Sequence, residues 1–314
     1  MRDEAEYQGD SQAVGLGARR CRDAEGVSAA ADGRLLVAVP SKGRMAPPAL
    51  ELLAAAGLRF EAGERALHVP CENAPVDLLL VRPHDIPEYV QDGVVHVGIT
   101  GANLVVEAEA DVVTLAELGF AACTLEAAVP RDAPQRSVEE LSDLRVATAY
   151  PVATRAAFAR IGVNAELVTV SGSVEAAPRL GLSDAVVDLV STGSTASVNG
   201  LRRIGTLLRS EAVLIANRDE AQGELVARLE LMIRGVVAAR RRRYLMLNAP
   251  EEALPRIREL LPGLGAPSVL PLAEPGQIAV HAAVDTDEIW DLLPPLKAAG
   301  ASSILVVPVE RLIP

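Results

Sequence analysis

The sequence predicts an α/β fold with mostly parallel sheets, followed by a small C-terminal module of ferredoxin-like βαββαβ order. Three observations support this prediction. The 314 residues are enough for two or three domains, and 50% of them are hydrophobic. Short apolar strands alternate with helices from Leu35 to Asn199. After Arg243 this alternation is replaced by the order strand, helix, strand, strand, helix, strand.

The first element is a continuous apolar strand, Leu35–Val39, of the kind that parallel sheets bury on both faces. Pro47 and Pro48 fit the first turn of the next helix, which we expect over Ala49–Ala56. The same alternation predicts strands at Val94–Ile99, Arg145–Ala149, Ala165–Val170 and Ala185–Val190. It predicts helices at Ala102–Glu107, Val152–Ile161, Ser173–Leu180 and Ser194–Asn199.

A long helix is predicted from Asp219 to Arg243, and it ends in four consecutive arginines. Cations stabilise a helix C-terminus, so an interdomain or subunit contact is favoured there over nucleic acid. The module that follows is predicted to contain strands Tyr244–Leu247, Ser268–Leu272, Gln277–Val284 and Ser303–Val307, with helices at Glu251–Leu261 and from Asp285 to Ala299. By analogy with other proteins of this fold, such a module is expected to bind a ligand or to regulate a catalytic core.

Composition and charge exclude several classes of protein. A formal charge of −12 argues against nucleic acid as a partner, and no apolar run approaches the ~18–20 residues of a membrane span. Cys21, Cys71 and Cys123 lack a CxxC spacing, which indicates free thiols in a reducing compartment. The N-terminus has no apolar signal-peptide region, so we expect a cytoplasmic protein. Residues 1–33 have no periodicity and are expected to be a disordered extension.

The segment over residues 185–195 is the strongest candidate site. An apolar strand containing Asp188 ends in a loop of hydroxyl residues around a glycine, and a helix is expected to begin at once: Ser191, Thr192, Gly193, Ser194, Thr195. Free N–H groups at a helix N-terminus, together with hydroxyl donors, form a cradle for phosphate, and Asp188 could hold ribose hydroxyls. The alternative is a surface turn with an ordinary helix cap. The sequence GxxxxGK[ST] of nucleoside triphosphatases is absent.

A second candidate is the loop that contains Lys42, Gly43 and Arg44. Two cations follow a buried strand, at the edge where open α/β sheets bind ligands, and both would bind phosphate oxygens. A solvated basic turn is the alternative. Lys42 also stands out because Lys297 is the only other lysine of the chain.

A third candidate combines Arg82–Tyr89, which includes Asp85, with the strand-end pair Thr100-Gly101. The pair occupies the place in the first α/β unit that the hydroxyl loop occupies in the second. Two units that each offer a loop to a shared cleft suit one ligand with two polar ends.

Familiar catalytic signatures are missing. The chain has neither GxSxG nor HExxH, and its four histidines lack metal-ligand spacing, so no protein metal ligand is assigned. An enzyme of this sequence would therefore act through positioning and electrostatics.

Taken together, these segments resemble the ATP phosphoribosyltransferase family in its long form, the first enzyme of histidine biosynthesis. The resemblance rests on LLVAVPSKGRM at 35–45, RPHDIPEYVQDG at 82–93, VGITGANLVVE at 97–107, RVATAYP at 145–151 and GSVEAAPRLGLSDAVVDLVSTGSTASVNGL at 172–201. The tail from SVLPLAEPGQIAVHAAV to LKAAGASSILVVPVERL is similar to the family's allosteric domain. The resemblance covers the chain from about residue 34 to its end.

The resemblance implies a two-lobed, periplasmic-binding-protein-like (type II) catalytic core and a regulatory ferredoxin-like domain. Residues 34–120 and 209–241 would form catalytic lobe I, 121–208 lobe II and 242–314 the regulatory domain. The implied reaction joins N1 of ATP to C1 of 5-phosphoribosyl 1-pyrophosphate with inversion and releases pyrophosphate, with Mg²⁺ carried on the pyrophosphate. A homo-oligomer that shifts between dimer and hexamer is also implied.

Site residues follow from the same resemblance. The phosphoribosyl portion would be bound by Glu175, Asp188, Ser191, Thr192, Gly193, Ser194 and Thr195. ATP would be bound by Lys42, Gly43, Arg44, Arg82, Asp85, Thr100 and Gly101, and Lys42 and Arg44 would stabilise the charge that develops in the transition state.

Feedback inhibition by L-histidine is also implied, through Asn248, Ser268, Ala283 and Ser303. Asn248 departs from an actinobacterial-type pattern, which would place Asp there. A neutral amide still accepts a bond from the ligand's ammonium, but about 1 kcal/mol more weakly, so inhibition could be weaker.

Two other functions fit parts of the sequence. A non-catalytic binding protein with this fold would need an export signal, or a helix-turn-helix before the lobes if it were a regulator; neither is seen. Type I phosphoribosyltransferases carry two adjacent acidic residues on the strand where this chain has only Asp188.

Overall fold

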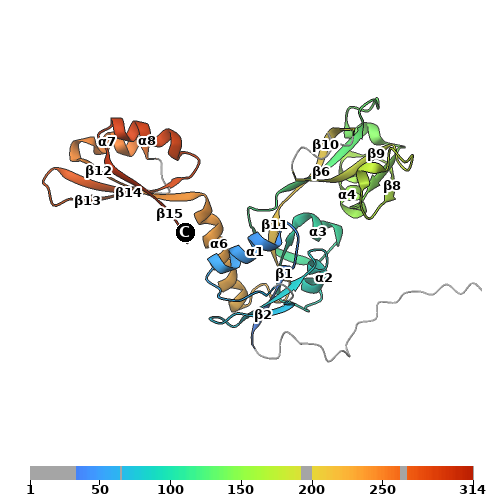
Figure 1. Ribbon diagram of the computed structural model, residues 1–314, viewed down its shortest axis with the longest axis horizontal. Helices are drawn as coiled ribbons and strands as arrows, with labels where there is room; N and C mark the ends of the chain where they lie inside the picture. The colour runs from blue at the N-terminus through green and yellow to red at the C-terminus, as the bar shows by residue number, and fades with distance from the viewer. Residues whose placement is uncertain (1–32, 64–65, 192–199, 262–266, 314) are drawn as a thin grey trace, which may run out of the picture.

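The computed structural model describes residues 33–63, 66–191, 200–261 and 267–313, and these form three sheets with their helices (Figure 1). The expected disordered extension, apart from Gly33, lies outside the described residues. So do Thr192–Thr195 of the hydroxyl loop and the helix expected at Ser194–Asn199.

The first sheet has six strands in the order β2-β3-β1-β4-β11-β5. Helices α1 and α6 pack on one face and α2 and α3 on the other, because the strands are apolar on both sides. We call this sheet and its helices the first lobe. Its elements are β1 (Leu35–Pro40), α1 (Ala46–Ala55), β2 (His68–Pro70), β3 (Val76–Val81), α2 (Ile86–Gln91), β4 (Val97–Gly101), α3 (Ala102–Glu107), β5 (Val112–Glu117), β11 (Ala212–Asn217) and α6 (Glu224–Arg240).

The second sheet has five strands in the order β10-β6-β9-β7-β8, and we call it and its helices the second lobe. Its core is built around Leu125, Leu141, Phe158 and Val187. Its elements are β6 (Cys123–Pro130), η1 (Val138–Leu141), β7 (Arg145–Thr148), α4 (Pro151–Ile161), β8 (Glu166–Thr169), η2 (Val174–Ala176), β9 (Ala185–Val190) and β10 (Leu201–Ser210).

The chain crosses between the lobes twice, from β5 to β6 and back from β10 to β11. At the return crossing, the Ala102 N–H donates to Glu211 O over 2.9 Å. The buried Ser210 hydroxyl lies 2.9 Å from both the Asn103 N–H and Asn103 Oδ1, which anchors the crossing to α3. Two α/β lobes joined in this way confirm the two-lobed, periplasmic-binding-protein-like core.

Both sheets are mixed, so the prediction of mostly parallel sheets is wrong. The central strands are parallel, as in β3-β1-β4 and β9-β7-β8. Strand β11 pairs antiparallel with β4 and β5, where the chain returns to the first lobe. In the second lobe, β6 pairs antiparallel with both β9 and β10. The helix predicted at Ser173–Leu180 is also reduced to the short turn η2, since Ser173 has a left-handed φ of 50°.

The third sheet has the order β13-β14-β12-β15 with every pair antiparallel, which confirms the ferredoxin-like module. Helices α7 and α8 cover one face, and the other face is open. Tyr244, Leu270 and Leu305 are exposed at 38%, 50% and 57%. The module contains β12 (Arg242–Pro250), η3 (Glu251–Ala253), α7 (Leu254–Leu260), β13 (Ser268–Pro271), β14 (Gln277–Asp285), α8 (Ile289–Ala298) and β15 (Ser302–Pro308).

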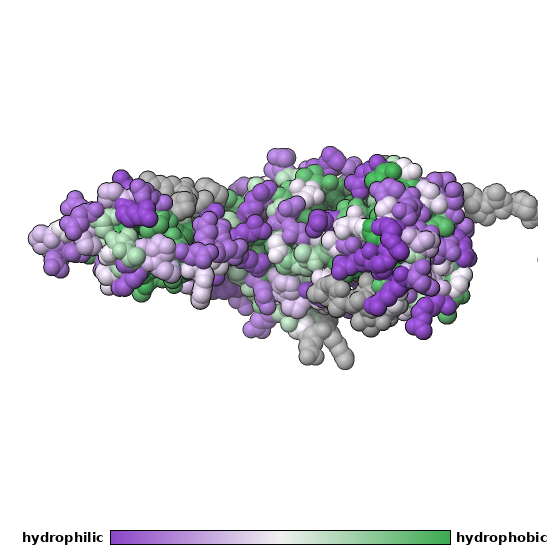
Figure 2. Space-filling model, turned by 90° about the horizontal axis from the view of Figure 1, so that it is seen from above, coloured by the Kyte–Doolittle hydropathy of each residue, from purple (hydrophilic) through white to green (hydrophobic). Residues whose placement is uncertain are grey.

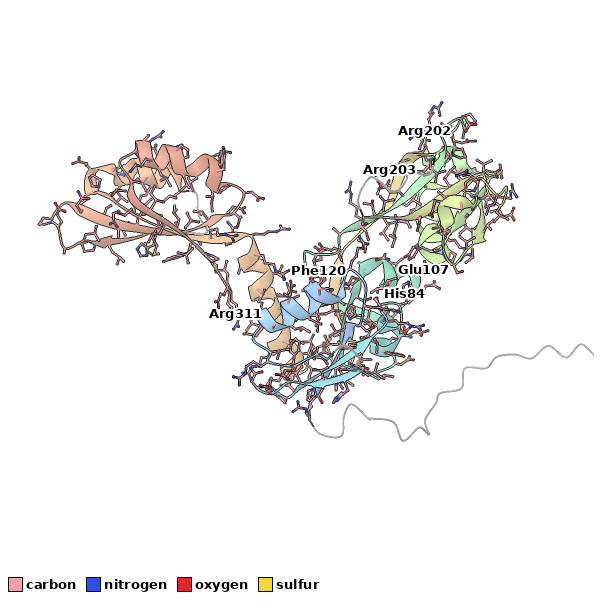
Figure 3. The ribbon with its side chains drawn as sticks, viewed as in Figure 1. His84, Glu107, Phe120, Arg202, Arg203 and Arg311 are labelled. Atoms are coloured by element: carbon pink, nitrogen blue, oxygen red, sulfur yellow. The ribbon has the colours of Figure 1, made fainter. Side chains whose placement is uncertain are left out.

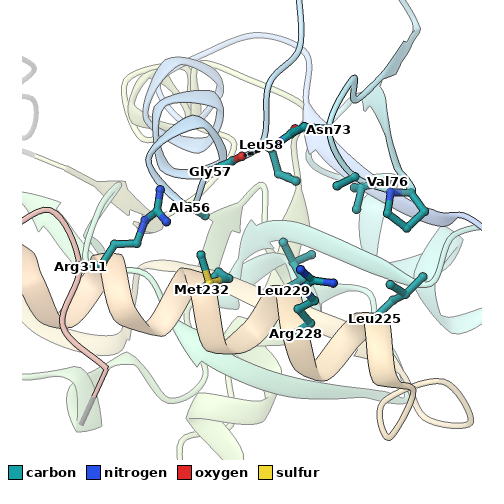
Figure 4. A pocket seen from close by; sticks show the side chains of 12 residues that line it. Ala56, Gly57, Leu58, Asn73, Val76, Leu225, Arg228, Leu229, Met232 and Arg311 are labelled. Atoms are coloured by element: carbon teal, nitrogen blue, oxygen red, sulfur yellow. Dashed lines mark hydrogen bonds between the residues drawn. The ribbon is translucent and has the colours of Figure 1, made fainter.

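The C-terminal tail returns from the module to the first lobe (Figure 4). Arg311 Nε donates to Ala55 O at the end of α1 over 2.9 Å, and the Leu312 N–H donates to Gly235 O in α6 over 2.9 Å. Beside this contact lies a cavity of about 280 Å³, lined by Leu229, Met232 and Arg311 among others. The tail thus ties the module to the lobe through few bonds.

No helix among the described residues is long and apolar enough to cross a membrane. The face seen in Figure 2 is covered mainly by hydrophilic side chains, with smaller apolar patches between them.

Candidate active site between the lobes

A cleft of about 570 Å³ opens where the two lobes meet at the crossing strands. The first lobe contributes Ala102 and Glu211 to its lining, and the second lobe contributes Cys123, Thr124 and Ser191. Three arginines also line it: Arg203, Arg209 and Arg241. Glu117 and Glu211 line the same space, so the charged side chains of the lining leave a net positive charge, which suits an anionic ligand.

The wall formed by β9 carries the carboxylates that the sequence singled out. A small cavity of about 40 Å³ is lined by Glu175, Asp188, Glu126 and Arg203. The structure therefore brings Glu175 and Asp188 together, although they are 13 positions apart in the sequence. Burial raises the pKa of the Asp188 carboxyl, and the neighbouring charge of Glu175 adds to the shift, while a hydrogen bond from the Leu189 N–H opposes it. Hydrogen bonds donated by ribose hydroxyls would favour the charged form of this carboxylate and so offset part of the cost of its burial.

Ser191 follows β9 directly and is exposed in the cleft lining. It is the one member of the predicted cradle within the described residues. The strand thus ends with its polar residues toward the space between the lobes, where open α/β sheets bind ligands.

The first lobe presents its cations on the turn after β1. Lys42, Gly43 and Arg44 are all exposed, and Gly43 has a left-handed φ of 80° that favours glycine. The Arg44 charge reaches across to the second lobe, where it lowers the pKa values of Cys123 and Tyr150 against the larger raising effect of burial. The Arg44 side chain is therefore close enough for its charge to act on residues of the second lobe.

The strand-end pair of β4 is more deeply buried than the sequence indicates. Thr100 is 0% exposed, and its hydroxyl donates to Pro83 O over 2.9 Å, so it ties β4 to the loop at 82–85. Asp85 is half-buried beside α2, and Arg82 is exposed. A Cβ added at Gly101 would lie 2.5 Å from Asn103 Oδ1, which explains why glycine stands there.

Sequence reasoning missed several residues of this site. Tyr150 is half-buried, and its pKa is raised by burial, then by Asp188, Cys123 and Glu107. Cys123 and Arg209 line the cleft from crossing strands, for which the local pattern gave no prediction. The one available signal was RVATAYP, which placed a tyrosine at the end of a predicted strand.

The four predicted histidine-binding residues lie in two pairs on the module. Asn248 is opposite Ser302 in β15, next to Ser303, and Ser302 Oγ donates to Asn248 O over 3.3 Å. Ser268 is opposite His281, two residues from Ala283. Asn248 itself pairs with Ala279, four residues from Ala283, which is roughly 13 Å along a strand. One copy of the module does not bring all four residues together.

A metal centre built by side chains alone is not found. No group of three or more His, Cys, Asp or Glu residues in the described part of the chain is arranged to hold a metal ion.

A two-lobed α/β core with a polar cleft between its lobes is typical of enzymes and binding proteins that act on small molecules. Comparison with known proteins shows which family of this class the chain belongs to. The ATP phosphoribosyltransferase family profile matches residues 82–235, and the profile of the HisG C-terminal domain matches residues 239–311. The ATP phosphoribosyltransferase of Maricaulis maris is 43% identical over 290 residues, covering 89% of this chain and 99% of the relative. That of Natronomonas pharaonis is 42% identical over 279 residues, covering 88% and 99%.

Among solved structures, the ATP phosphoribosyl transferase (HisG:HisZ) complex from Thermotoga maritima matches with a TM-score of 0.54 and 25% identity. The match covers 64% of this chain and 98% of that chain. The chain therefore belongs to the ATP phosphoribosyltransferase family, whose members are pentosyltransferases of histidine biosynthesis.

Proposed function

We propose that this chain transfers the 5-phosphoribosyl group of phosphoribosyl pyrophosphate to N1 of ATP, with inversion and release of pyrophosphate. The observation that carries the proposal is the arrangement at the end of β9. Ser191 lines the cleft between the lobes, Asp188 lines an adjoining cavity that shares Val190 and Arg203 with the cleft, and the Arg44 charge acts on Tyr150 of the second lobe. The product, 1-(5-phosphoribosyl)-ATP, contains groups from both substrates, so a cleft between two polar walls suits it.

The second lobe would bind the phosphoribosyl portion. Asp188 and Glu175 would accept hydrogen bonds from the ribose hydroxyls, and their shared cavity supports this role. The hydroxyl loop would hold the 5-phosphate through backbone N–H groups and side-chain hydroxyls: Ser191, Thr192, Gly193, Ser194 and Thr195.

The first lobe would bind ATP and the departing pyrophosphate. Lys42 and Arg44 would contact phosphate oxygens, since both are exposed cations on one turn and the Arg44 charge acts on Tyr150 of the second lobe. The remaining contacts of this wall would be supplied by Gly43, Arg82 and Asp85, while the buried Thr100 and Gly101 would position the loop at 82–85 and the start of α3 without touching ATP.

The chemistry requires no protein nucleophile. Displacement at the anomeric carbon develops positive charge on the sugar and negative charge on the leaving pyrophosphate. Lys42 and Arg44 would stabilise that negative charge from fixed positions, which is where electrostatic catalysis has its largest effect. Asp188 and Glu175 would orient the ribose so that its C1 faces the purine.

We propose that Mg²⁺ enters on the pyrophosphate group rather than in a protein site. Arg203 and Arg209 in the cleft lining would pair with phosphate oxygens, and no group of three or more His, Cys, Asp or Glu residues in the described part of the chain is arranged to hold the cation by itself. When bound, Mg²⁺ would neutralise charge on the leaving group.

We further propose that residues 34–120 with 209–241, and 121–208, act as the two catalytic lobes of a cytoplasmic enzyme. Residues 242–314 would form a regulatory domain that binds L-histidine. Asn248 with Ser303, and Ser268 with the backbone of Ala283, offer polar groups for such a ligand at two separate places on the module. A homo-oligomer, dimeric or hexameric, is supported by the exposed apolar side chains of the open face.

An ultraviolet assay with ATP, phosphoribosyl pyrophosphate and Mg²⁺, run with and without L-histidine, tests the proposal. Product that is suppressed by histidine supports both the core and the regulatory domain. If the rate of product formation does not change with histidine, the catalytic core is supported and the assignment of residues 242–314 as a histidine-binding domain is contradicted. An absence of product with ATP still bound would favour a binding protein.

Asn248→Asp sharpens the regulatory part. A carboxylate would strengthen the bond to the ligand's ammonium by about 1 kcal/mol, which is roughly a fivefold lower half-inhibitory histidine concentration. An unchanged concentration would remove Asn248 from the proposed site. Turnover without histidine serves as the control, because the substitution lies on the module.

A further inference from the structure

Helix α4 of the second lobe receives its N-terminal cap from the first lobe. Its own N-cap residue is Tyr150, which makes no side-chain capping bond. Pro151 has no N–H, so the N–H groups of Val152 and Ala153 are the first that need acceptors. Glu107, the last residue of α3, accepts both: Oε1 from Val152 over 3.2 Å and Oε2 from Ala153 over 2.9 Å.

This contact joins the lobes through one carboxylate. Figure 3 places Glu107 where the first lobe meets the second. The two residues it caps lie 45 and 46 positions further along the chain. Bonds from N–H groups to a charged acceptor are stronger than neutral ones, and a helix N-terminus favours negative charge. Glu107 is half-buried, which limits screening by solvent and salt.

The capped helix end lies next to the proposed site. Helix α4 follows β7, and β7 pairs in parallel with β9, which carries Asp188. Tyr150 immediately precedes α4, and its hydroxyl is under the influence of both Asp188 and Arg44. The position of the α4 N-terminus therefore sets where Tyr150 lies relative to the two walls of the cleft.

We propose that Glu107 is a positioning residue for the transfer reaction, because it fixes the α4 N-terminus and Tyr150 against the first lobe. The residue touches no substrate and acts through the relative position of the lobes. This inference rests on the proposed placement of the substrates between the lobes. When the lobes are aligned for only part of the time, the apparent affinity for substrates that span the cleft falls by that fraction. Saturating substrates then restore the alignment.

Glu107→Gln tests the proposal with little change in shape. The amide retains one acceptor but turns an N–H group toward a helix N-terminus and removes the charge. The KM value for phosphoribosyl pyrophosphate, whose two ends would lie on different lobes, should rise about tenfold, while kcat stays within about twofold. Glu107→Ala should raise this KM value further. Glu51→Gln, an equally charge-reducing change on the exposed face of α1, should leave both constants unchanged.

Hydrogen exchange at Val152 and Ala153 provides a readout that needs no activity. The wild-type amides should be protected, and Glu107→Gln should accelerate their exchange while amides of the second-lobe core stay protected. Faster exchange with unchanged KM values would overturn the positioning role. Exchange unchanged from wild type would overturn the contact itself. A fall in kcat and in thermal midpoint without a change in KM would mean that Glu107 only stabilises the fold. An inactive wild type would refute the proposed function, while exchange would still test the contact.

Discussion

The two lobes meet the cleft with different chemistry. The first lobe presents two exposed cations, Lys42 and Arg44, on the turn after β1, whereas the second lobe presents the half-buried carboxylates of Asp188 and Glu175. Exposed cations attract phosphate over a distance but are screened by salt. Half-buried acceptors act only at contact and require an ordered partner. The two walls therefore suit different parts of the ligands. The cations of the first lobe suit the phosphates of ATP and pyrophosphate, and the carboxylates of the second lobe suit the ribose hydroxyls.

The largest effect is expected at the hydroxyl loop, which is proposed to hold the 5-phosphate. Gly193→Val should abolish binding of phosphoribosyl pyrophosphate, because a branched side chain would block close approach of the backbone to phosphate. Titration calorimetry measures this directly, and ATP binding with an unchanged thermal midpoint is the control. Normal turnover in this variant would remove the cradle from the second lobe.

Arg44→Ala tests the charged wall of the first lobe. Loss of one well-placed donor to the leaving group should lower kcat by about 10²–10³-fold. The remaining activity should depend less on ionic strength than in wild type. Arg59→Ala removes another exposed cation of the same lobe and should behave as wild type. Equal losses in both variants would mean that net charge alone matters.

Asp188→Asn separates function from stability in the second lobe. The folded-state pKa of Asp188 is raised, mainly by burial, so the folded protein binds its proton more tightly than the unfolded chain does. Its effect on stability is thus most favourable at low pH and is lost as the pH rises from the ordinary aspartate value through the raised one. At pH 7 the neutral amide should raise the thermal midpoint by about 1–3 °C while turnover falls.

The contrary results for Asp188→Asn are equally specific. A lower midpoint at pH 7 would show that the ionised carboxylate stabilises the fold. A midpoint difference that does not shrink as the pH is lowered toward 4 would contradict the titration of this group.

The smallest effect compares two glycines, one from each lobe. Gly101→Ala would push a methyl group to within 2.5 Å of Asn103 Oδ1 and disturb its bond to Ser210, so it should destabilise the protein by about 1–3 kcal/mol. Gly172→Ala in the second lobe meets nothing within 4 Å and should be neutral. Urea denaturation measures both free energies of unfolding. Equal values would mean that the crossing at Ser210 tolerates movement.

Local signals predicted much of the fold. Helix Ala102–Glu107 and strand Ala185–Val190 have the predicted bounds, since glycine and hydroxyl residues mark their ends within a few positions. Strands β6 and β10, which begin and end the second lobe, were not predicted. Their pairing joins Glu126 to Thr206, which are 80 residues apart, and no local pattern encodes such a contact. The cap that Glu107 gives α4 was missed for the same reason.

The candidate site shows the same division. The sequence named Asp188 and Glu175 from one motif, and the structure brings them to one cavity. Tyr150, Cys123 and Arg209 join the site only because two lobes fold against each other. Side chains that a motif carries can be predicted one segment at a time. Those that depend on the alignment of the lobes need the structure.

Separate binding of the two substrates tests the central claim most directly. Titration calorimetry of phosphoribosyl pyrophosphate with Mg²⁺, and of ATP, would be run on wild type, Gly193→Val and Lys42→Ala. The account predicts that Gly193→Val loses phosphoribosyl pyrophosphate and retains ATP, while Lys42→Ala weakens ATP more than it weakens phosphoribosyl pyrophosphate, because only the pyrophosphate end of the latter would reach Lys42. If either variant weakened both ligands equally, the division of the ligands between the two walls would be contradicted.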